Sequence, residues 1–416
     1  MNPGPLLTLL ALSCVRGPVV SGRELVYVTV LFRHGDRSPI RAYPTDPYQE
    51  SAWPQGFGQL SQVGMKQHYN LGQFLRKRYT GFLKESYDRQ EISVRSTDFD
   101  RTLMSAEANL AGLYPPNGSQ VFNPDIKWQP IPVHTVPMPE ERLLSFPLSD
   151  CPRYKQLMSE TEQTPEFRNV TAFYQDVIEL VRNKTLLNKT NIESVWGVYD
   201  TLFCEAQHNM TPPDWVTPDV MTSLKYLKDF AFRMAFGIYK QTEKSRLQGG
   251  LLLGEIVKNL TLMATENPKP KLKLMMLSAH DTTVAALQAS LNVFNGIQPP
   301  YASCHIFELN KEENGAYTVS MFYRNNTELY PVELPGCALD CPLEDFRALT
   351  KPSISDDRDQ ECQLPSPGTS KEVIISLAVS GCVLFILIAT LLAVICRQTE
   401  PMRSRGYQHV INEAES

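Results

Sequence analysis

The sequence has no surplus of positive charge, no internal repeat and no long low-complexity tract. Its 416 residues carry 40 Lys and Arg against 45 Asp and Glu, a formal net charge of −5, so the charge balance gives no reason to expect a nucleic-acid partner. Hydrophobic residues make up 42% of the chain, which excludes a disordered or collagen-like protein. At about 100 to 200 residues per domain, the length alone allows two to four folded domains.

Long apolar runs are scarce as well. Residues 373–396 (VIISLAVSGCVLFILIATLLAVIC) contain no charge and are long enough to cross a hydrocarbon core of roughly 30 Å at about 1.5 Å per residue. Residues 6–15 are too short to cross. With the small residues that follow, they predict a signal peptide over 1–22, although no Lys or Arg precedes Leu6. The alternatives are an apolar first strand or an uncleaved anchor.

The charges beside the span predict its orientation. Residues 397–416 hold three arginines, whereas Lys371 on the other flank stands next to Glu372. The positive-inside rule therefore predicts a type I protein with a single C-terminal transmembrane helix and a cytoplasmic tail. N-x-S/T sequons agree, since all of them precede the span; the alternative is chance recurrence of a short pattern. They lie at Asn117, Asn169, Asn183, Asn188, Asn209, Asn259 and Asn325.

Cysteine is sparse outside the apolar segments. Of nine cysteines, Cys14 falls in the signal peptide and Cys382 and Cys396 fall in the span. The even remainder predicts three disulfides in an oxidising compartment, among 15 possible pairings, with Cys337 and Cys341 close enough to pair locally. A zinc site is disfavoured because C-x3-C has no second ligand pair at zinc-finger spacing. The six cysteines are Cys151, Cys204, Cys304, Cys337, Cys341 and Cys362.

Strand-like and helix-like patterns alternate between the signal peptide and the span. Residues 25–32 (LVYVTVLF) and 272–277 (LKLMML) have the largely apolar character of strands buried on both faces. Helical patterns occupy 101–113 and 283–291. This alternation predicts an α/β sheet domain.

The middle and the end of this region differ from the sheet domain. Helical periodicity dominates about 154–264 and predicts a helical cap inserted into the sheet domain. Residues 352–372 are rich in Pro, Ser, Asp and Glu and predict a stalk between that domain and the membrane. The sheet domain with its cap is therefore expected over 23–351.

The residues best suited to chemistry stand at the ends of predicted strands. Residues 33–39 (RHGDRSP) follow the first strand, residues 95–101 (RSTDFDR) follow a short strand at 92–94, and His280-Asp281 follow the third. The carboxyl ends of strands in open α/β sheets form ligand-binding crevices. Because guanidinium groups bind phosphate oxygens bidentately, this pattern indicates an anionic, oxygen-rich ligand.

These side chains can carry a phosphoryl transfer without a metal or other cofactor. Arginines neutralise the phosphate oxygens, an imidazole attacks phosphorus, and a carboxylic acid protonates the leaving oxygen. The attacking imidazole must be neutral, and neighbouring guanidinium groups favour this because they lower its pKa. Such a site can keep its nucleophile at acidic pH.

RHGDRSP, RSTDFDR and the late His-Asp pair resemble the histidine acid phosphatases. The similarity continues through WPQGFGQL, DRTLMSAEANLAGLYPPNG, VYDTLFCE and YASCHIFEL. It implies a mixed α/β sheet flanked by helices, the phosphoglycerate-mutase-like or histidine phosphatase fold. It also implies a homodimer and hydrolysis of phosphate monoesters, with low substrate selectivity, through a phosphohistidine. The implied disulfides are Cys151–Cys362, Cys204–Cys304 and Cys337–Cys341.

The same resemblance implies a role for each site residue. His34 is the nucleophile and Asp281 the proton donor, while Arg33, Arg37, Arg101 and His280 bind the phosphate. Two alternatives stay open. One is a phytase-like enzyme acting on inositol phosphates, and the other is a non-catalytic glycosylated receptor with a vestigial phosphatase fold.

The predicted tail adds a sorting signal. Tyr407 and Val410 resemble the tyrosine-based endocytic signal of lysosomal members of the family, which docks as an extended peptide. The resemblance implies clathrin adaptor complexes as partners and delivery to the lysosome membrane with the catalytic domain lumenal. It also implies release of a soluble enzyme by cleavage near the stalk.

Several residues near the motifs have simpler explanations. Asp281 could cap the helix that it precedes, a role compatible with proton donation. Arg95 is assigned to a structural ion pair, and Asp36 and Ser38 to ordering the turn. His134 is left open, and the remaining structural assignments are His68, His305 and the apolar residues of Phe230–Phe236.

Overall fold

The computed structural model describes residues 22–147, 150–364 and 371–399. The predicted signal peptide, apart from Gly22, and the part of the tail that holds Tyr407 and Val410 lie outside the described residues. Contacts divide the chain into a large compact unit that ends at Cys362 and a second unit that begins at Gln363. Each unit is described by itself.

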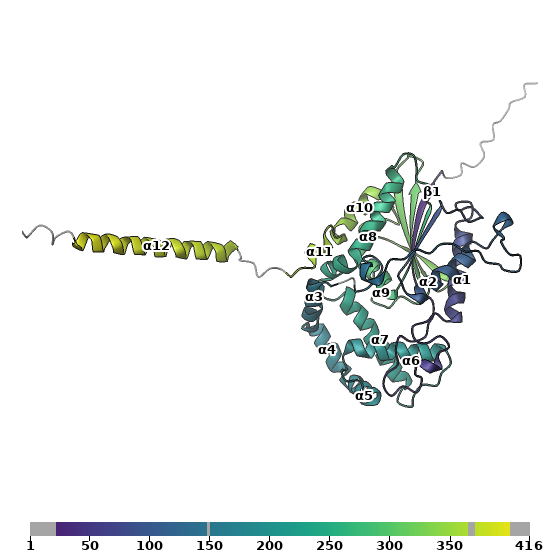
Figure 1. Cartoon of the computed structure of the whole chain (residues 1–416), viewed down its shortest axis with the longest axis horizontal. Coiled ribbons are helices and arrows are strands. Elements are labelled where there is room, and N and C mark those ends of the chain that lie inside the picture. Colours follow the sequence, from purple (N-terminus) through teal and green to yellow (C-terminus); the bar gives the residue numbers. More distant parts are fainter. Residues whose placement is uncertain (1–21, 148–149, 365–370, 400–416) are drawn as a thin grey trace, which may run out of the picture. The chain divides into compact units, whose positions relative to one another are not determined.

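A seven-stranded mixed sheet forms the centre of the large unit (Figure 1). Its main path runs β2-β3-β1-β4-β5-β6, and β7 pairs with β5. β1 and β2 run parallel to β3, whereas β4 is antiparallel to β1. The carboxyl ends of β1, β2 and β3 therefore meet at one edge of the sheet. The strands are β1 (Glu24–Arg33), β2 (Ile92–Ser96), β3 (Leu274–Ala279), β4 (Cys304–Lys311), β5 (Tyr317–Asn325), β6 (Glu328–Val332) and β7 (Asp340–Pro342).

Helices cover both faces of the sheet because β1 is apolar on both sides. Val28, Val30 and Phe32 pack in the core formed with α1 and α2. Tyr27 and Leu31 pack in the core formed with α8, α9 and α10, as the alternation of side chains along a strand requires. This confirms the predicted mixed sheet flanked by helices. The helices are α1 (Gln62–Arg78), α2 (Asp100–Leu113), α8 (Gln241–Thr265), α9 (Asp281–Ser290) and α10 (Leu343–Thr350).

A helical cap lies between α2 and α8 in the sequence. In α4 and α7 a threonine cap is followed by a proline at the start of the helix; Thr164 accepts from the N–H of Phe167, and Thr217 from that of Val220. The apolar stripe of Phe230–Phe236 packs inside the cap and against α9. The cap helices are α3 (Pro152–Glu162), α4 (Pro165–Phe173), α5 (Gln175–Thr185), α6 (Ile192–Gln207) and α7 (Pro218–Phe236).

The predicted cap of 154–264 extends too far. Leu252, Leu253 and Ile256 of α8 are buried in the core beneath β1, so α8 belongs to the helical layer of the sheet domain. The hydrophobic periodicity of the α8 sequence predicts a helix correctly. It does not indicate which neighbouring element the apolar face of that helix packs against.

The predicted stalk also begins too early. Residues 352–362 pack on α8: Ile354 fills the space that Gly254 leaves, and Arg358 donates from Nε to the carbonyl of Leu247 at 2.7 Å. The polar composition of this segment indicates a linker, but its residues pack on the large unit. It contains α11 (Arg358–Glu361), and short 3-10 turns occur at Glu50–Ala52, Gly118–Gln120, Met138–Glu140 and Lys351–Ser353.

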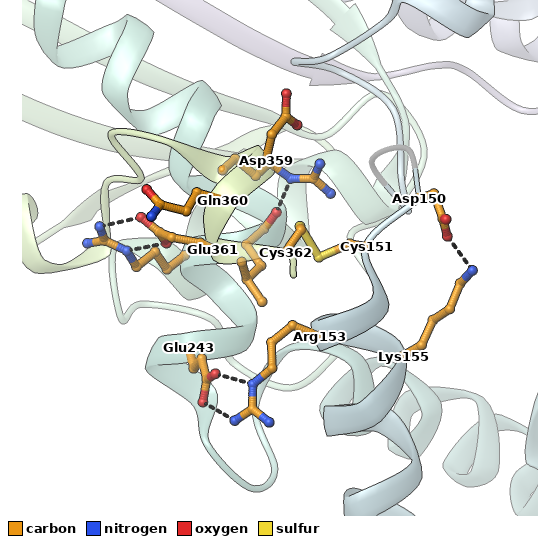
Figure 2. The surroundings of a disulfide bond; sticks show 12 residues. Asp150, Cys151, Arg153, Lys155, Glu243, Asp359, Gln360, Glu361 and Cys362 are labelled. Atoms are coloured by element: carbon orange, nitrogen blue, oxygen red, sulfur yellow. Dashed lines mark hydrogen bonds and ion pairs between the residues drawn. A yellow bond between two sulfur atoms is a disulfide. The ribbon is translucent and has the colours of Figure 1, made fainter. Parts of the chain in front are cut away.

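A disulfide joins this C-terminal segment to the start of the cap. Cys151 and Cys362 are bonded across 211 residues of sequence, and the N–H of Arg153 donates to the carbonyl of Cys362 at 2.9 Å. Figure 2 shows the bond, with the Arg153 guanidinium directed at Glu243 and Lys155 directed at Asp150. Cys337 and Cys341 form a second disulfide, so two of the three implied pairs are present.

The third implied pair, Cys204–Cys304, is not formed, and both residues are buried free thiols. Cys304 begins β4 and packs in the core on the α1 and α2 face. Cys204, on α6, instead contacts the Tyr301 hydroxyl at 3.5 Å and the Arg37 guanidinium at 3.6 Å. The two thiols therefore face different surroundings.

The second unit contains a long apolar helix, α12 (Lys371–Thr399). Within it, Ile375–Arg397 has a mean hydropathy of 2.8 and none of it is buried. Its length and composition suit a membrane span, in agreement with the span predicted over 373–396.

Candidate active site

The three predicted strand ends meet in the structure. The N–H of His34, just after β1, donates to the carbonyl of Ala279 at the end of β3 at 3.0 Å, and the N–H of Thr97, just after β2, donates to that of Ser278 at 3.2 Å. A cavity of about 440 Å³ opens at this edge. Five of the six predicted site residues line it: His34, Arg37, Arg101, His280 and Asp281.

The turn that carries His34 is held by close packing on α1. A Cβ on Gly35 would stand 2.5 Å from the carbonyl oxygen of Gly64, and a Cβ on Gly64 would stand 2.2 Å from that of Asp36, so both positions require glycine. The Asp36 carboxylate accepts hydrogen bonds from Ser61 at 2.5 Å and from His208 at 2.9 Å. These contacts agree with the structural role predicted for Asp36, and Ser38 likewise orders the turn by donating to the carbonyl of Gly56 at 2.7 Å.

His34 has the tautomer that a nucleophile needs. Its Nδ1 lies 2.8 Å from the carbonyl oxygen of Gly35. A carbonyl can only accept, so Nδ1 carries the proton and Nε2 keeps its lone pair. Burial lowers the pKa of His34 well below its usual value, and the charges of Arg101, Arg33 and Arg37 lower it further. Both effects favour the neutral imidazole over its cation.

Arg37 and Arg33 are held by carboxylates. Arg37 makes a bidentate pair with Asp200, with both N–O distances at 3.0 Å. Arg33 is buried and does not line the cavity. Its Nη2 lies 2.9 Å from Oδ2 of Asp281, and its guanidinium lies 4.1 Å from the centre of the Tyr301 ring. These contacts orient both side chains and neutralise part of their charge.

Arg101 is the least neutralised of the three arginines. Its guanidinium lies 4.6 Å from the centre of the Phe99 ring, and within the described part of the chain it has no carboxylate at ion-pair distance. Burial, together with the charge of Arg37, lowers its pKa to about 10. A group in this position gains from an added anion.

His280 and Asp281 begin α9. His280 is the N-cap residue, so the cap considered for Asp281 is one position earlier. Nε2 of His280 lies 3.0 Å from the Thr97 hydroxyl, and burial, followed by the charge of Arg101, lowers the pKa of His280 to about 3. For Asp281, burial disfavours the charged form, but Arg33 and the Gln298 amide favour it, and the pKa is lowered.

The structure adds three residues that the sequence motifs do not single out: Asp200, Gln298 and Tyr301. Asp200 lies in VYDTLFCE and Tyr301 in YASCHIFEL, two segments quoted for the family resemblance without a role. Gln298 belongs to no quoted motif, and only its position in space places it beside Asp281.

The other residues considered lie outside the cavity. Arg95 pairs with both oxygens of Glu141 at 2.9 and 3.0 Å, as predicted. His68 and His305 are fully buried, and His134 is exposed and pairs with Arg95 at the sheet edge. In the described ranges, no group of three or more His, Cys, Asp or Glu side chains is arranged to hold a metal ion.

Comparisons with known proteins agree with the site. The sequence model of the histidine phosphatase superfamily (branch 2) matches residues 24–324. Lysosomal acid phosphatase of Homo sapiens is 57% identical over 408 residues, which cover 97% of this chain and 95% of that protein. Lysosomal acid phosphatase of Xenopus laevis is 54% identical over 421 residues, covering 100% of this chain and 96% of that protein.

More distant relatives share the fold. Prostatic acid phosphatase of Homo sapiens is 52% identical over 346 residues, covering 82% of this chain and 89% of that protein. Among solved structures, a phytase of Hafnia alvei in complex with tartrate matches with a TM-score of 0.62 at 20% identity, covering 84% of this chain and 100% of that one. With the motif residues gathered in one cavity and most of its length matched, the chain belongs to the histidine phosphatase superfamily, branch 2.

Proposed function

We propose that this acid phosphatase transfers the phosphoryl group of a phosphate monoester to Nε2 of His34 and then to water. In the first step the N–P bond forms as the ester P–O bond breaks, and Asp281 gives its proton to the leaving oxygen. In the second step water attacks phosphorus and gives its proton to Asp281, while the N–P bond breaks and inorganic phosphate is released.

The observation that carries this proposal is the contact between Nδ1 of His34 and the carbonyl of Gly35. It leaves the lone pair of Nε2 on a residue that lines the cavity beside Arg37 and Arg101. Arg37, Arg101 and His280 would contact the phosphate oxygens. Arg33, which is buried next to Asp281, contributes its charge and holds the Asp281 carboxyl group. The chain's own cations then stabilise the charge that develops in the transition state.

Trapping of the labelled phosphoenzyme tests the mechanism. Full-length protein in detergent is mixed with a ³²P-labelled aryl phosphate at pH 5 and quenched in alkali, which preserves phosphohistidine. Wild type should retain label, and His34→Ala should retain none. His134→Ala, at an exposed histidine outside the cavity, is the matched control and should still be labelled. Label that persists in His34→Ala would refute His34 as the nucleophile.

The protein is expected to reach the lysosome as a type I membrane precursor. Asn117, Asn169, Asn183, Asn188 and Asn209 are exposed on the large unit, whereas Asn259 and Asn325 are half-buried, and glycans on the exposed sites would be compatible with a lumenal large unit. Adaptor binding through Tyr407 and Val410 would deliver the protein to the lysosome. Cleavage near the predicted stalk of residues 352–372 would release it into the lumen.

An exposed apolar cluster supports a homodimer. Val121, Phe122, Ile126 and Trp128 are between 41% and 61% exposed, and the rings of Phe122 and Trp128 are 6.4 Å apart. Exposed apolar side chains gathered on one short segment are typical of interaction surfaces. A second copy of the chain would bury them.

A further inference from the structure

Gln298 occupies an unusual position beside the proposed proton donor. Its side-chain amide donates from Nε2 to Oδ2 of Asp281 at 2.7 Å. The same oxygen lies 2.9 Å from Nη2 of Arg33, and Oδ1 of Asp281 accepts from the N–H of Thr282 at 2.7 Å. Three donors therefore fix the rotation of this carboxyl group.

Gln298 is itself held in place from two sides. Its backbone N–H donates to Oδ1 of Asp229 on α7 at 3.2 Å, and Asp229 is paired with Lys228 at 2.6 Å and with Lys225 at 3.0 Å. The next residue, Pro299, accepts from Nη1 of Arg33 at 2.7 Å. The loop that carries Gln298 thus connects the cap helix to both members of the Arg33–Asp281 pair.

We propose that Gln298 is a positioning residue for the proton donor, which holds the Asp281 carboxyl group for transfer and limits the pH range in which poor leaving groups are released. This inference rests on the proposed function, since it acts through Asp281. It concerns a residue that neither the family motifs nor the sequence patterns single out.

The sign of the effect follows from the chemistry of the amide. An N–H donor stabilises the ionised carboxylate, so its removal lets Asp281 keep its proton to higher pH. Loss of the contact also frees the rotation of the carboxyl group, which lowers the rate of proton transfer. The other charged or titratable groups around Asp281 remain in place. These are Arg33, Arg37, Arg101, His34, His280 and Asp200, with Asp229, Lys228 and Lys225 behind Gln298.

The test compares pH profiles of Gln298→Leu and wild type on two substrates, an alkyl phosphate and an aryl phosphate with an acidic phenol. Full-length protein in detergent is used for both. For the alkyl ester, kcat/KM of the variant, which reports the steps up to formation of the phosphohistidine, should fall several-fold at the optimum, and the upper limb of its pH profile should move up by about one pH unit. The kcat/KM of the aryl ester and inhibition by inorganic phosphate should change little, since neither phenoxide departure nor phosphate binding needs a proton from Asp281.

Two further variants decide between positioning and general damage. Gln298→Asn keeps the amide but is one methylene shorter, and should behave like Gln298→Leu. Ile297→Ala alters the neighbouring side chain, which is 50% exposed, and should match wild type. Identical limbs in Gln298→Leu and wild type, or equal shifts with both esters, would overturn the inference. If wild type lacks labelled His34, the proposed mechanism fails instead, so the two failures are distinguishable.

Discussion

Nη2 of Arg33 lies 2.9 Å from Oδ2 of Asp281 in a buried ion pair. The pair joins the phosphate-binding cations to the group proposed as the acid, and the charge of Arg33 helps to lower the pKa of Asp281. In the resting site the carboxyl group therefore favours its ionised form. Phosphate binding adds negative charge nearby. This charge interacts with Arg33 and disfavours the ionised carboxylate, so it raises the pKa of Asp281.

The leaving group should expose the role of Asp281. Asp281→Asn removes the proton but keeps most of the shape, so we expect kcat/KM for an alkyl phosphate, which reports the steps up to phosphoryl transfer, to fall by about 10²- to 10⁴-fold. The kcat/KM of an aryl phosphate, whose phenoxide leaves without full protonation, should fall far less. The two rates are compared at pH 5 for the same preparation. Equal slowing with both esters would contradict the assignment.

Asp200 should matter for Arg37 and not for proton transfer. Asp200→Asn removes the charge that pairs with a guanidinium that is almost fully buried, so we expect about 3 kcal/mol less stability. We also expect a comparable loss of kcat/KM for alkyl and aryl esters. Thermal unfolding and steady-state rates provide the measurements. Asp219→Asn, an exposed acid on the cap, is the control; a preference for one ester would argue against a role confined to Arg37.

A buried carboxyl pair should make stability rise as the pH falls. Burial, together with the charge of Asp46, raises the pKa of Glu205 to about 8, whereas a free glutamic acid titrates near 4.3. The folded protein then holds a proton that the unfolded chain lacks. Between these two pKa values the effect is at most about 1.4 kcal/mol per pH unit, gained on acidification.

Glu205→Gln should remove this dependence. Unfolding temperatures of full-length protein measured from pH 4.5 to 8 should vary less in the variant, and near pH 8 the variant should be the more stable form. Buried histidines with lowered pKa, such as His68 and His305 at about 3, act in the opposite direction below pH 6.5. They are the same in both proteins and cancel in the comparison. Parallel curves would contradict the prediction.

The apolar cluster around Phe122 should decide the oligomeric state. Phe122→Glu combined with Trp128→Glu places charge on side chains that a dimer would bury, so we expect sedimentation velocity to report a monomer for the variant and a dimer for wild type. Phe173→Glu, at an 80% exposed position on the cap, should leave the dimer intact. A wild-type monomer would refute the proposed dimer directly.

Chelation should leave the activity unchanged. The proposed transition state is stabilised by arginines and histidine, so EDTA followed by desalting should not alter kcat with an aryl phosphate. Loss of activity that Mg²⁺ or Zn²⁺ restores would refute the metal-free mechanism.

The sheet and the strand-end residues could be predicted because both depend on local pattern. The apolar run of β1 and the RHGDRSP turn are contiguous in sequence, and the carboxyl ends of parallel strands must meet. Asp200 and Gln298 could not be derived in this way. They reach the site from a cap helix and from a distant loop, and their roles depend on which side chains those segments approach.

Other predictions were wrong for the same reason, because local sequence pattern does not reveal tertiary contacts. α8 has the same helical period as its cap neighbours, yet it packs on the sheet. Residues 352–362 have the composition of a linker, yet Ile354 and Arg358 contact α8. The implied Cys204–Cys304 bond depends on two thiols facing each other, which neither sequence position reveals.

The Cys151–Cys362 bond closes the polypeptide into a covalent ring that contains His280 and Asp281. His34 and Arg101 lie outside this ring, in the segment that precedes Cys151. A single protease cut within the ring would open it without releasing a fragment. A cut after Cys362, by contrast, would separate the apolar helix and leave the ring closed. A single cut between Cys151 and Cys362 therefore leaves both ends joined, whereas a cut between Cys362 and α12 would produce a soluble enzyme with the ring intact.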